Sequence, residues 1–202
     1  MCVSKFHPAE TIMEAYHAGE RIFGESRVQE LVAKQPELPA DIRWHFIGHL
    51  QTNKIKFIAP FVSLIHGVDS LKVLQEINKQ AERANKSVEC LLQIHIAEEE
   101  SKFGFSADEL LDVLEENVSL QFPYVKIVGL MGMATYTDNE SQVRKEFRSL
   151  KALFDKVKTT YFLGEDSFCE LSMGMSQDYQ IAIEEGSTLI RIGTSIFGER
   201  EY

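Results

Sequence analysis

The amine of Lys5 is the first group in this sequence that could do chemistry. Lys5 closes the short apolar run over residues 2–4, and desolvation at such a place disfavours the charged ammonium. The free amine is the nucleophile that forms a Schiff base with an aldehyde or ketone. Because surface lysines are common, this feature taken alone indicates a solvated lysine at a strand end more often than a reactive one.

Arg191 is the second candidate, within an apolar run over residues 188–192. In an extended strand Leu189, Arg191 and Gly193 point to one face, and Ile190 and Ile192 point to the other. Both faces of a barrel strand are buried, and the charge of a guanidinium cannot be removed, so Arg191 needs a partner. That partner is either a core carboxylate in a structural ion pair or a bound ligand.

Small and hydroxyl-bearing residues follow the last two apolar runs and could hold a phosphate. Gly193 and Thr194 come directly after the run that contains Arg191, and Ser172 and Ser176 flank a glycine after the run over residues 169–172. Glycine lets a backbone N–H approach a ligand closely, and a short helix that begins there would present further N–H groups. Barrel enzymes often bind phosphate after strands seven and eight.

The segment over residues 44–54 ends another apolar run with polar side chains. His49 and Asn53 are expected to face the mouth of a barrel, whereas His45, within the run, is expected to be a buried core histidine. No spacing matches a metal motif such as HExxH, and no nucleophile elbow supports a Ser-His-Asp triad. The sequence therefore predicts no metal site and no set of catalytic residues.

The composition is that of a globular protein with an acidic surface. The chain has 202 residues, of which 44% are hydrophobic and 26% charged, and its formal net charge is −10. This charge repels nucleic acid on average, although one basic pocket would be enough for a small phosphorylated molecule.

The cysteines and the N-terminus predict a cytoplasmic location. Cys2, Cys90 and Cys169 are few, odd in number and far apart, which fits a reducing compartment. Lys5 and His7 interrupt any signal-peptide core, and no apolar run is long enough to span a membrane. We expect no membrane contact.

A repeating alternation of strands and helices must position these groups. Short apolar runs, typical of strands, cover residues 1–4, 21–23, 44–47, 62–66, 88–96, 125–131, 169–172 and 188–192. Helical patterns lie between them over residues 8–17, 53–59, 70–85, 106–116, 139–157 and 178–185. Ser70, the capping box Ser106/Glu109 and Gly186 mark helix ends.

Eight such units predict an α/β fold with a single closed (β/α)8 barrel of TIM type over residues 1–202. An open doubly wound sheet is the alternative, although no GxGxxG or GxxxxGK[ST] motif supports it. In a barrel the functional residues lie at the C-terminal ends of the strands and in the following loops. Lys5, Arg191 and the hydroxyl groups fall in those places.

Together these residues resemble the pyridoxal phosphate homeostasis protein family. The resemblance runs through the whole chain and is carried by residues 3–5 with Pro8, 23–30, 44–54, 129–133, 171–176 and 191–198. It implies the barrel of the alanine racemase N-terminal domain without that enzyme's second, β domain. It also implies that Lys5 holds pyridoxal 5′-phosphate (PLP) as a Schiff base and Arg191 faces the pyridine nitrogen, with the phosphate held by Ser172, Gly193 and Thr194, and Ser176 beside them.

The expected role is to store, shield or deliver PLP, with PLP-dependent apo-enzymes as recipients. A guanidinium beside the pyridine nitrogen keeps that nitrogen unprotonated, so the ring is a poorer electron sink for carbanion chemistry. The family has no established enzymatic activity. The alternatives are a PLP enzyme with weak amino-acid racemase activity, for which His49 or Tyr136 could be the opposing base, and a Schiff-base aldolase without a cofactor.

Two features depart from the family pattern. Ser26 stands where the family usually has Asn, so a contact to the ring is lost or mediated by water. Lys5 is also close to the start of the chain, so the usual leading helix and the start of strand one are expected to be missing, and chain ends fray unless they are held. We expect a monomer, because no apolar face extends beyond those that the barrel needs.

Overall fold

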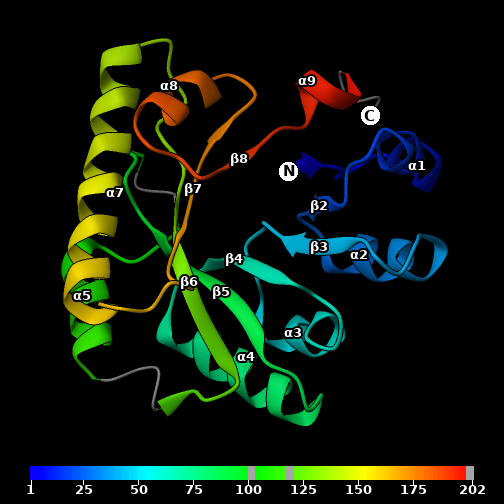
Figure 1. The fold of residues 1–202 in the computed structure, drawn as a ribbon, viewed down its shortest axis with the longest axis horizontal. Coiled ribbons are helices and arrows are strands. Elements are labelled where there is room, and N and C mark those ends of the chain that lie inside the picture. Colours follow the sequence, from blue (N-terminus) through cyan, green and yellow to red (C-terminus); the bar gives the residue numbers. More distant parts are fainter. Residues whose placement is uncertain (100–102, 117–120, 199–202) are drawn as a thin grey trace.

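Eight parallel strands form one sheet, and their order in the sheet is their order along the chain (Figure 1). This computed structural model describes residues 1–99, 103–116 and 121–198. The strands are β1 (Cys2–Val3), β2 (Ile22–Glu25), β3 (Arg43–Phe46), β4 (Leu64–Val68), β5 (Val88–Ile94), β6 (Val125–Gly132), β7 (Glu170–Met175) and β8 (Leu189–Arg191).

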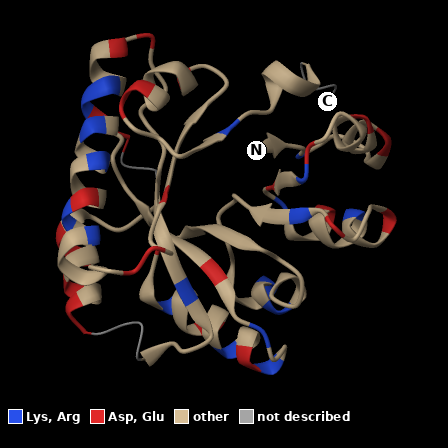
Figure 2. Ribbon diagram, in the orientation of Figure 1, with Lys and Arg blue, Asp and Glu red and all other residues tan. Residues whose placement is uncertain are grey.

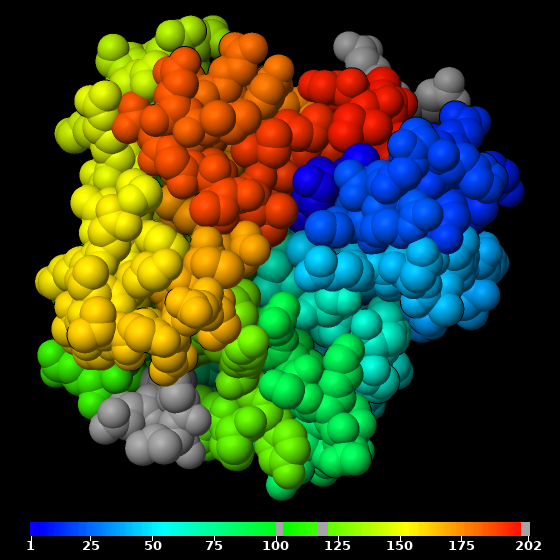
Figure 3. Space-filling view, in the orientation of Figure 1, coloured from blue at the N-terminus to red at the C-terminus, as the bar shows by residue number. Residues whose placement is uncertain are grey.

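The two edges of this sheet meet, because the N-terminal strand pairs with the residue after β8. Cys2 and Ile192 form a parallel bridge. The Val3 N–H donates to the Ile192 carbonyl oxygen at 2.7 Å, and the Ile192 N–H donates to the Met1 carbonyl oxygen at 3.2 Å. In Figure 3 the C-terminal segment, in red, lies directly against the N-terminal segment, in blue. The predicted barrel is confirmed, and the open sheet is excluded.

Helices follow the strands and cover the outside of the barrel (Figure 1). They are α1 (Ala9–His17), α2 (Val28–Lys34), α3 (Thr52–Ile58), α4 (Leu71–Arg83), α5 (Ala107–Glu115), α7 (Glu140–Tyr161), α8 (Tyr179–Glu184) and α9 (Thr194–Phe197), and a 3₁₀ turn covers Gln35–Glu37. The sequence pattern did not predict α2, although it predicted α3, which has the same length of seven residues. It ended the α7 helix at residue 157, one turn before its end.

The helix ends agree with the sequence in two of three cases. The Ser106 side chain accepts a hydrogen bond from the Glu109 N–H at 3.2 Å, and the Glu109 carboxylate accepts one from the Ser106 N–H at 2.8 Å. Gly186 has the positive φ expected after a helix. Ser70 precedes α4, but its hydroxyl donates to Asp69 at 3.2 Å instead of capping the helix.

The hydrophobic core lies on both faces of the sheet. A large cluster packs between the strands and the helices, and Phe23, Phe46 and Phe147 are among its fully buried members. A smaller cluster comes from the other face of the strands and fills part of the barrel interior; it consists of Leu64, Leu91, Val128 and Met131, with Met133 and Leu189 against it. Buried polar groups fill other parts of the interior, and some of them belong to the candidate site.

Charged residues of both signs are interspersed along the outer helices, most clearly on α7 (Figure 2). Arg144 and Arg148 of this helix pair with Glu184 and Glu185 of the α8 region at 2.7–2.8 Å. Among the described residues, no helix is both long enough and apolar enough to cross a membrane.

Candidate functional site

A pocket of about 500 Å³ opens at the C-terminal ends of the strands, where β1, β7 and β8 lie side by side. These strands and the segments after them supply most of its wall. Of the residues singled out in the sequence, the pocket brings together Lys5, Ser176, Arg191, Gly193 and Thr194. An amine, a guanidinium and two hydroxyl groups therefore share one cavity, although the sequence separates them by up to 189 residues.

Lys5 lies in a tight turn directly after β1. The His7 N–H donates to the Ser4 carbonyl oxygen across this turn at 3.1 Å. Phe6 adopts a φ of +69°, a left-handed conformation that residues with a side chain seldom adopt. Such strain persists only where surrounding contacts hold it, and it is concentrated at functional sites.

Arg191 is 5% exposed and lines the floor of the pocket. Its Nη1 donates to the Ser172 carbonyl oxygen at 2.9 Å and to the Ser172 hydroxyl at 2.7 Å, and its Nη2 donates to the Gly132 carbonyl oxygen at 3.0 Å. These partners are neutral, so within the described part of the chain Arg191 forms hydrogen bonds and no ion pair with a core carboxylate. Burial lowers the pKa of Arg191 to about 10, and nearby Asp178 opposes this, so the guanidinium stays protonated at neutral pH.

A chain of hydrogen bonds continues from Arg191 into the barrel interior. The Ser172 hydroxyl lies 3.0 Å from His66 Nδ1, and His66 Nε2 lies 3.1 Å from His45 Nδ1. Burial lowers the pKa of His45 to about 3 and the pKa of His66 well below its usual value, so both rings are neutral. Because Arg191 donates to the Ser172 hydroxyl, we assign the Ser172 proton to His66 Nδ1 and the His66 Nε2 proton to His45.

Ser172 therefore lies in a different place from the one expected. It lies within β7, which extends to Met175, and it is fully buried below the rim. The sequence pattern ended this strand too early because Gly174 resembles a turn residue. Gly174 instead adopts a φ of +94° inside the strand, where the register against β8 shifts. Ser172 contacts Arg191 and not the pocket rim.

The residues that remain at the rim come from the loops after β7 and β8. The Gly193 N–H lies 3.4 Å from the Ser176 hydroxyl oxygen, so these two loops meet. A Cβ atom on Gly193 would lie 3.2 Å from the Val3 carbonyl oxygen, a distance that leaves little room for a side chain. Thr194 follows and is exposed to solvent. Hydroxyl groups and backbone N–H groups thus gather at this end of the pocket.

Besides Ser172, three further residues that the sequence indicated lie outside the lining of this pocket. His49 stacks on Phe103 with 3.9 Å between ring centroids, and its Nδ1 lies 2.9 Å from Asp69 Oδ2. Asn53 is exposed in the first turn of α3, and Ser26 is half-buried in the loop after β2. His45 is buried, as expected.

Other residues of the wall were not predicted to bind anything, and they are Val3, Ile47, Gln177 and Ser195. Gln177 and Ser195 directly follow the predicted residues Ser176 and Thr194 in the sequence, so for these two the signal was the position after a strand and not the residue type. Met133 and Met175 also line the pocket, while Met131 and Met173 are buried in the core. Tyr136, the possible opposing base of a racemase, also lines the pocket.

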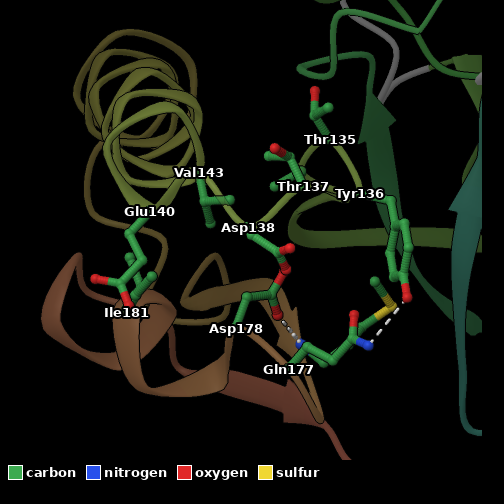
Figure 4. Close-up of a pocket in the computed structure, with 11 residues that line it drawn as sticks. Thr135, Tyr136, Thr137, Asp138, Glu140, Val143, Gln177, Asp178 and Ile181 are labelled. Carbon is green, nitrogen blue, oxygen red and sulfur yellow. Dashed lines mark hydrogen bonds between the residues drawn. The ribbon is translucent and has the colours of Figure 1, made fainter.

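A second cavity of about 420 Å³ adjoins the pocket and shares Tyr136, Met175 and Gln177 with it. Figure 4 shows the Gln177 side chain pointing toward the Tyr136 hydroxyl, to which the Gln177 amide donates at 3.2 Å. The carboxylates of Asp138 and Glu140 also line this second cavity.

The family model of the alanine racemase N-terminal domain matches residues 1–201 of this chain. The pyridoxal phosphate homeostasis protein of Aquifex aeolicus is 42% identical over 98% of this chain and 86% of its own length. The human protein of the same name is 38% identical over 100% of this chain and 76% of its own length.

Solved structures show the same relationship. PipY of Synechococcus elongatus PCC7942, solved without PLP, superposes with a TM-score of 0.91 at 37% identity, over 98% of this chain and 91% of PipY. PipY with PLP bound superposes with a TM-score of 0.87 at 36% identity. Alanine racemase of Bartonella henselae, at 16% identity, shares the fold with a TM-score of 0.73. The chain therefore belongs to the alanine racemase N-terminal domain family and, within it, to the pyridoxal phosphate homeostasis proteins.

Proposed function

We propose that this chain binds PLP in the pocket at the mouth of the barrel and takes part in PLP homeostasis, with PLP held as a Schiff base on Lys5. The observation that carries the proposal is the convergence of Lys5, Arg191, Gly193 and Thr194 on one cavity of about 500 Å³. Cofactor sites in proteins commonly have volumes of this order and a few converging polar groups.

The donor set fits the three functional parts of PLP. The amine of Lys5 suits the aldehyde. The protonated Arg191 suits the pyridine nitrogen, and Ser176, Gly193 and Thr194 suit the phosphate, because hydroxyl and backbone N–H groups donate to its oxygens. Met133 and Met175 supply soft, apolar contact for an aromatic ring. The solved structure of the similar protein PipY with PLP bound supports PLP as the ligand.

Arg191 favours storage or delivery of PLP over catalysis. When bound, PLP supplies an electron sink, and its strength depends on protonation of the pyridine nitrogen. Arg191 keeps its proton at neutral pH and is fixed by three hydrogen bonds, so a proton on the facing nitrogen would meet a like charge. Arg191 therefore holds the nitrogen unprotonated, and Ser172 holds Arg191.

A weak amino-acid racemase is the second candidate. Racemisation needs a second acid/base group opposite Lys5, and Tyr136 lines the same pocket. His49 is less suited to this role, because it pairs with Asp69 outside the pocket lining. The carrier remains the preferred function because of the charge beside the pyridine nitrogen.

We also propose that the protein is a cytoplasmic monomer with one domain over residues 1–202, and that PLP-dependent apo-enzymes are its recipients. The parallel sheet joins the first and last strands of the chain into one unit, which supports a single domain. Sedimentation equilibrium across a range of protein concentrations tests the monomer. PLP transfer to an apo-enzyme, measured with and without a PLP-trapping phosphatase, tests direct delivery.

The test of the main proposal is reduction of the PLP complex with borohydride, followed by peptide mass spectrometry. We expect PLP on Lys5, and we expect Lys5→Ala to lose the Schiff-base absorbance. The matched control is Lys72→Ala, which removes an exposed lysine of α4 and should leave the absorbance unchanged. Attachment to another lysine, or an unchanged spectrum in Lys5→Ala, would contradict the assignment.

A further inference from the structure

The residues on either side of Lys5 are both held by one buried ionic cluster, which is distinct from the pocket wall. We define the Lys34 cluster as Lys34 with Glu25 and Glu30. Lys34 Nζ donates to Glu25 at 2.8 Å and to Glu30 at 2.6 Å. Glu25 ends β2, while Glu30 and Lys34 lie on α2. The cluster thus joins the second strand, the following helix and the turn that carries Lys5.

On the N-terminal side of Lys5, the cluster fixes Ser4. The Ser4 hydroxyl donates to Glu25 Oε1 at 2.6 Å, and Lys34 Nζ donates to the Ser4 carbonyl oxygen at 3.0 Å. Both the side chain and the backbone of Ser4 are therefore bound, and Ser4 is fully buried.

On the C-terminal side of Lys5, the cluster fixes Phe6. The Phe6 N–H donates to Glu30 Oε1 at 2.6 Å. This residue has the left-handed φ of +69°, and the guanidinium of Arg27, next to α2, lies 4.5 Å from its ring centroid. The contact with Glu30 thus holds the chain in a conformation that it would otherwise seldom adopt.

The burial of this cluster is difficult to explain by stability alone. Glu25 is fully buried and Lys34 is 8% exposed, and removing ions from water often costs as much as their pairing returns. Lys34 donates to Ser4, Glu25 and Glu30, which uses all three protons of its ammonium. A lysine held in this way is not available to an aldehyde, so Lys34 does not compete with Lys5.

We propose that Lys34, Glu25 and Glu30 are positioning residues that hold the turn at Ser4 and Phe6 so that the amine of Lys5 meets the PLP aldehyde. The inference rests on the proposed function. An amine reacts quickly only when it is held close to the carbonyl in the correct direction, and a displacement of about 1 Å can lower a rate by about a hundredfold. The Lys5 side chain has several rotatable bonds, so a fixed backbone at Ser4 and Phe6 narrows the positions that its amine can take.

The test is Glu30→Ala, which removes the acceptor of the Phe6 N–H at a side chain that is 20% exposed. Two quantities are measured: the rate of Schiff-base formation with PLP, and the affinity for pyridoxine 5′-phosphate, which has no aldehyde. We expect the rate to fall by about tenfold to a hundredfold and the affinity to stay unchanged. Glu30→Gln, which keeps an acceptor oxygen, should recover most of the rate.

Glu37→Ala is the matched control, because it removes an exposed carboxylate from the 3₁₀ turn after α2, and both quantities should stay unchanged. The double variant Lys34→Met/Glu25→Gln removes the buried charges together, so that neither is left unpaired, and it should repeat the effect of Glu30→Ala. Unchanged rates in both variants, or a parallel loss of rate and pyridoxine 5′-phosphate affinity, would overturn the inference. If the unmodified chain itself formed no Schiff base, the proposed function would fail first and the inference with it.

Discussion

Ser172 and Arg191 contact each other inside the barrel, on neighbouring strands, through two hydrogen bonds of 2.7 and 2.9 Å from one guanidinium nitrogen. Ser172 is fully buried and Arg191 is 5% exposed. The serine thus lies behind the arginine, and the arginine lies between the serine and the pocket. The proposed contact of Arg191 with PLP would therefore depend on a residue that does not line the pocket.

Replacing Ser172 with alanine should weaken PLP binding through Arg191. The variant removes one hydrogen bond to a charged group, and such a bond contributes about 1.5–3 kcal/mol. We expect PLP affinity to fall by about tenfold, measured by absorbance titration. Ser187→Ala is the control, because its hydroxyl donates to β7 at the Leu171 and Met173 carbonyl oxygens. The control should lower the free energy of unfolding without changing the affinity; equal affinity losses in both variants would refute the role of Ser172.

Replacing Gly193 with alanine should disturb the proposed phosphate end of the pocket. The new Cβ would lie 3.2 Å from the Val3 carbonyl oxygen and 3.4 Å from Val3 Cβ, so the loop or β1 must shift by a few tenths of an ångström. We expect about a tenfold lower affinity for PLP, since short charge-assisted hydrogen bonds are sensitive to such shifts. In the control Gly19→Ala, the Cβ meets nothing within 4 Å but the φ of +106° is strained. Stability alone should fall in the control, and an unchanged affinity in Gly193→Ala would contradict the expectation.

The paired histidines in the barrel interior should make the protein sensitive to acid. Burial depresses the folded-state pKa of His45 to about 3 and that of His66 well below its usual value. Their contribution to stability is therefore fully present above the unfolded pKa of about 6.5 and is lost as pH falls toward 3. Each group contributes a slope of about 1.4 kcal/mol per pH unit within this window.

Urea unfolding at several pH values between 6.5 and 4 measures this slope. His45→Phe removes one of the two groups, so its slope should be lower than that of the unmodified chain by up to about 1.4 kcal/mol per pH unit. Burial raises the pKa of Glu25, which makes the free energy of unfolding depend on pH in the opposite direction. Glu25 is present in both proteins, so its effect cancels when the two slopes are compared. Identical slopes in the two proteins would show that His45 does not resist protonation.

Most of the fold follows from local pattern, but closure of the barrel does not. The eight apolar runs match the eight strands to within a few residues, because buried parallel strands require continuous apolar sequence. Lys5 lies near Arg191 only because the first and last strands meet. From the sequence, the resemblance to the family indicated that Lys5 and Arg191 share a site. Their spacing along the chain could not indicate this.

The Lys34 cluster was not predicted from the sequence, for a different reason. Glu30 and Lys34 are four residues apart on a helix, which is the usual spacing of a solvated surface pair. Their burial depends on Glu25 at the end of the neighbouring strand and on the turn at Ser4, and these contacts arise only in the folded barrel. The folded barrel also separates residues that the sequence placed together. His49 and Asn53 follow β3 as expected, yet they lie outside the pocket lining.

The choice between a carrier and a racemase depends on Tyr136. Its hydroxyl accepts a hydrogen bond from Gln177 at 3.2 Å, and the residue is 77% exposed. Because solvent weakens the exposed hydrogen bond between Gln177 and Tyr136, Tyr136→Phe should change PLP affinity by less than about fivefold. If the chain is a carrier, the holoprotein should exchange the α-proton of alanine in D₂O no faster than free PLP does, and Tyr136→Phe should behave identically. A faster exchange that Tyr136→Phe abolishes would instead identify Tyr136 as the base opposite Lys5, and the racemase would become the preferred function.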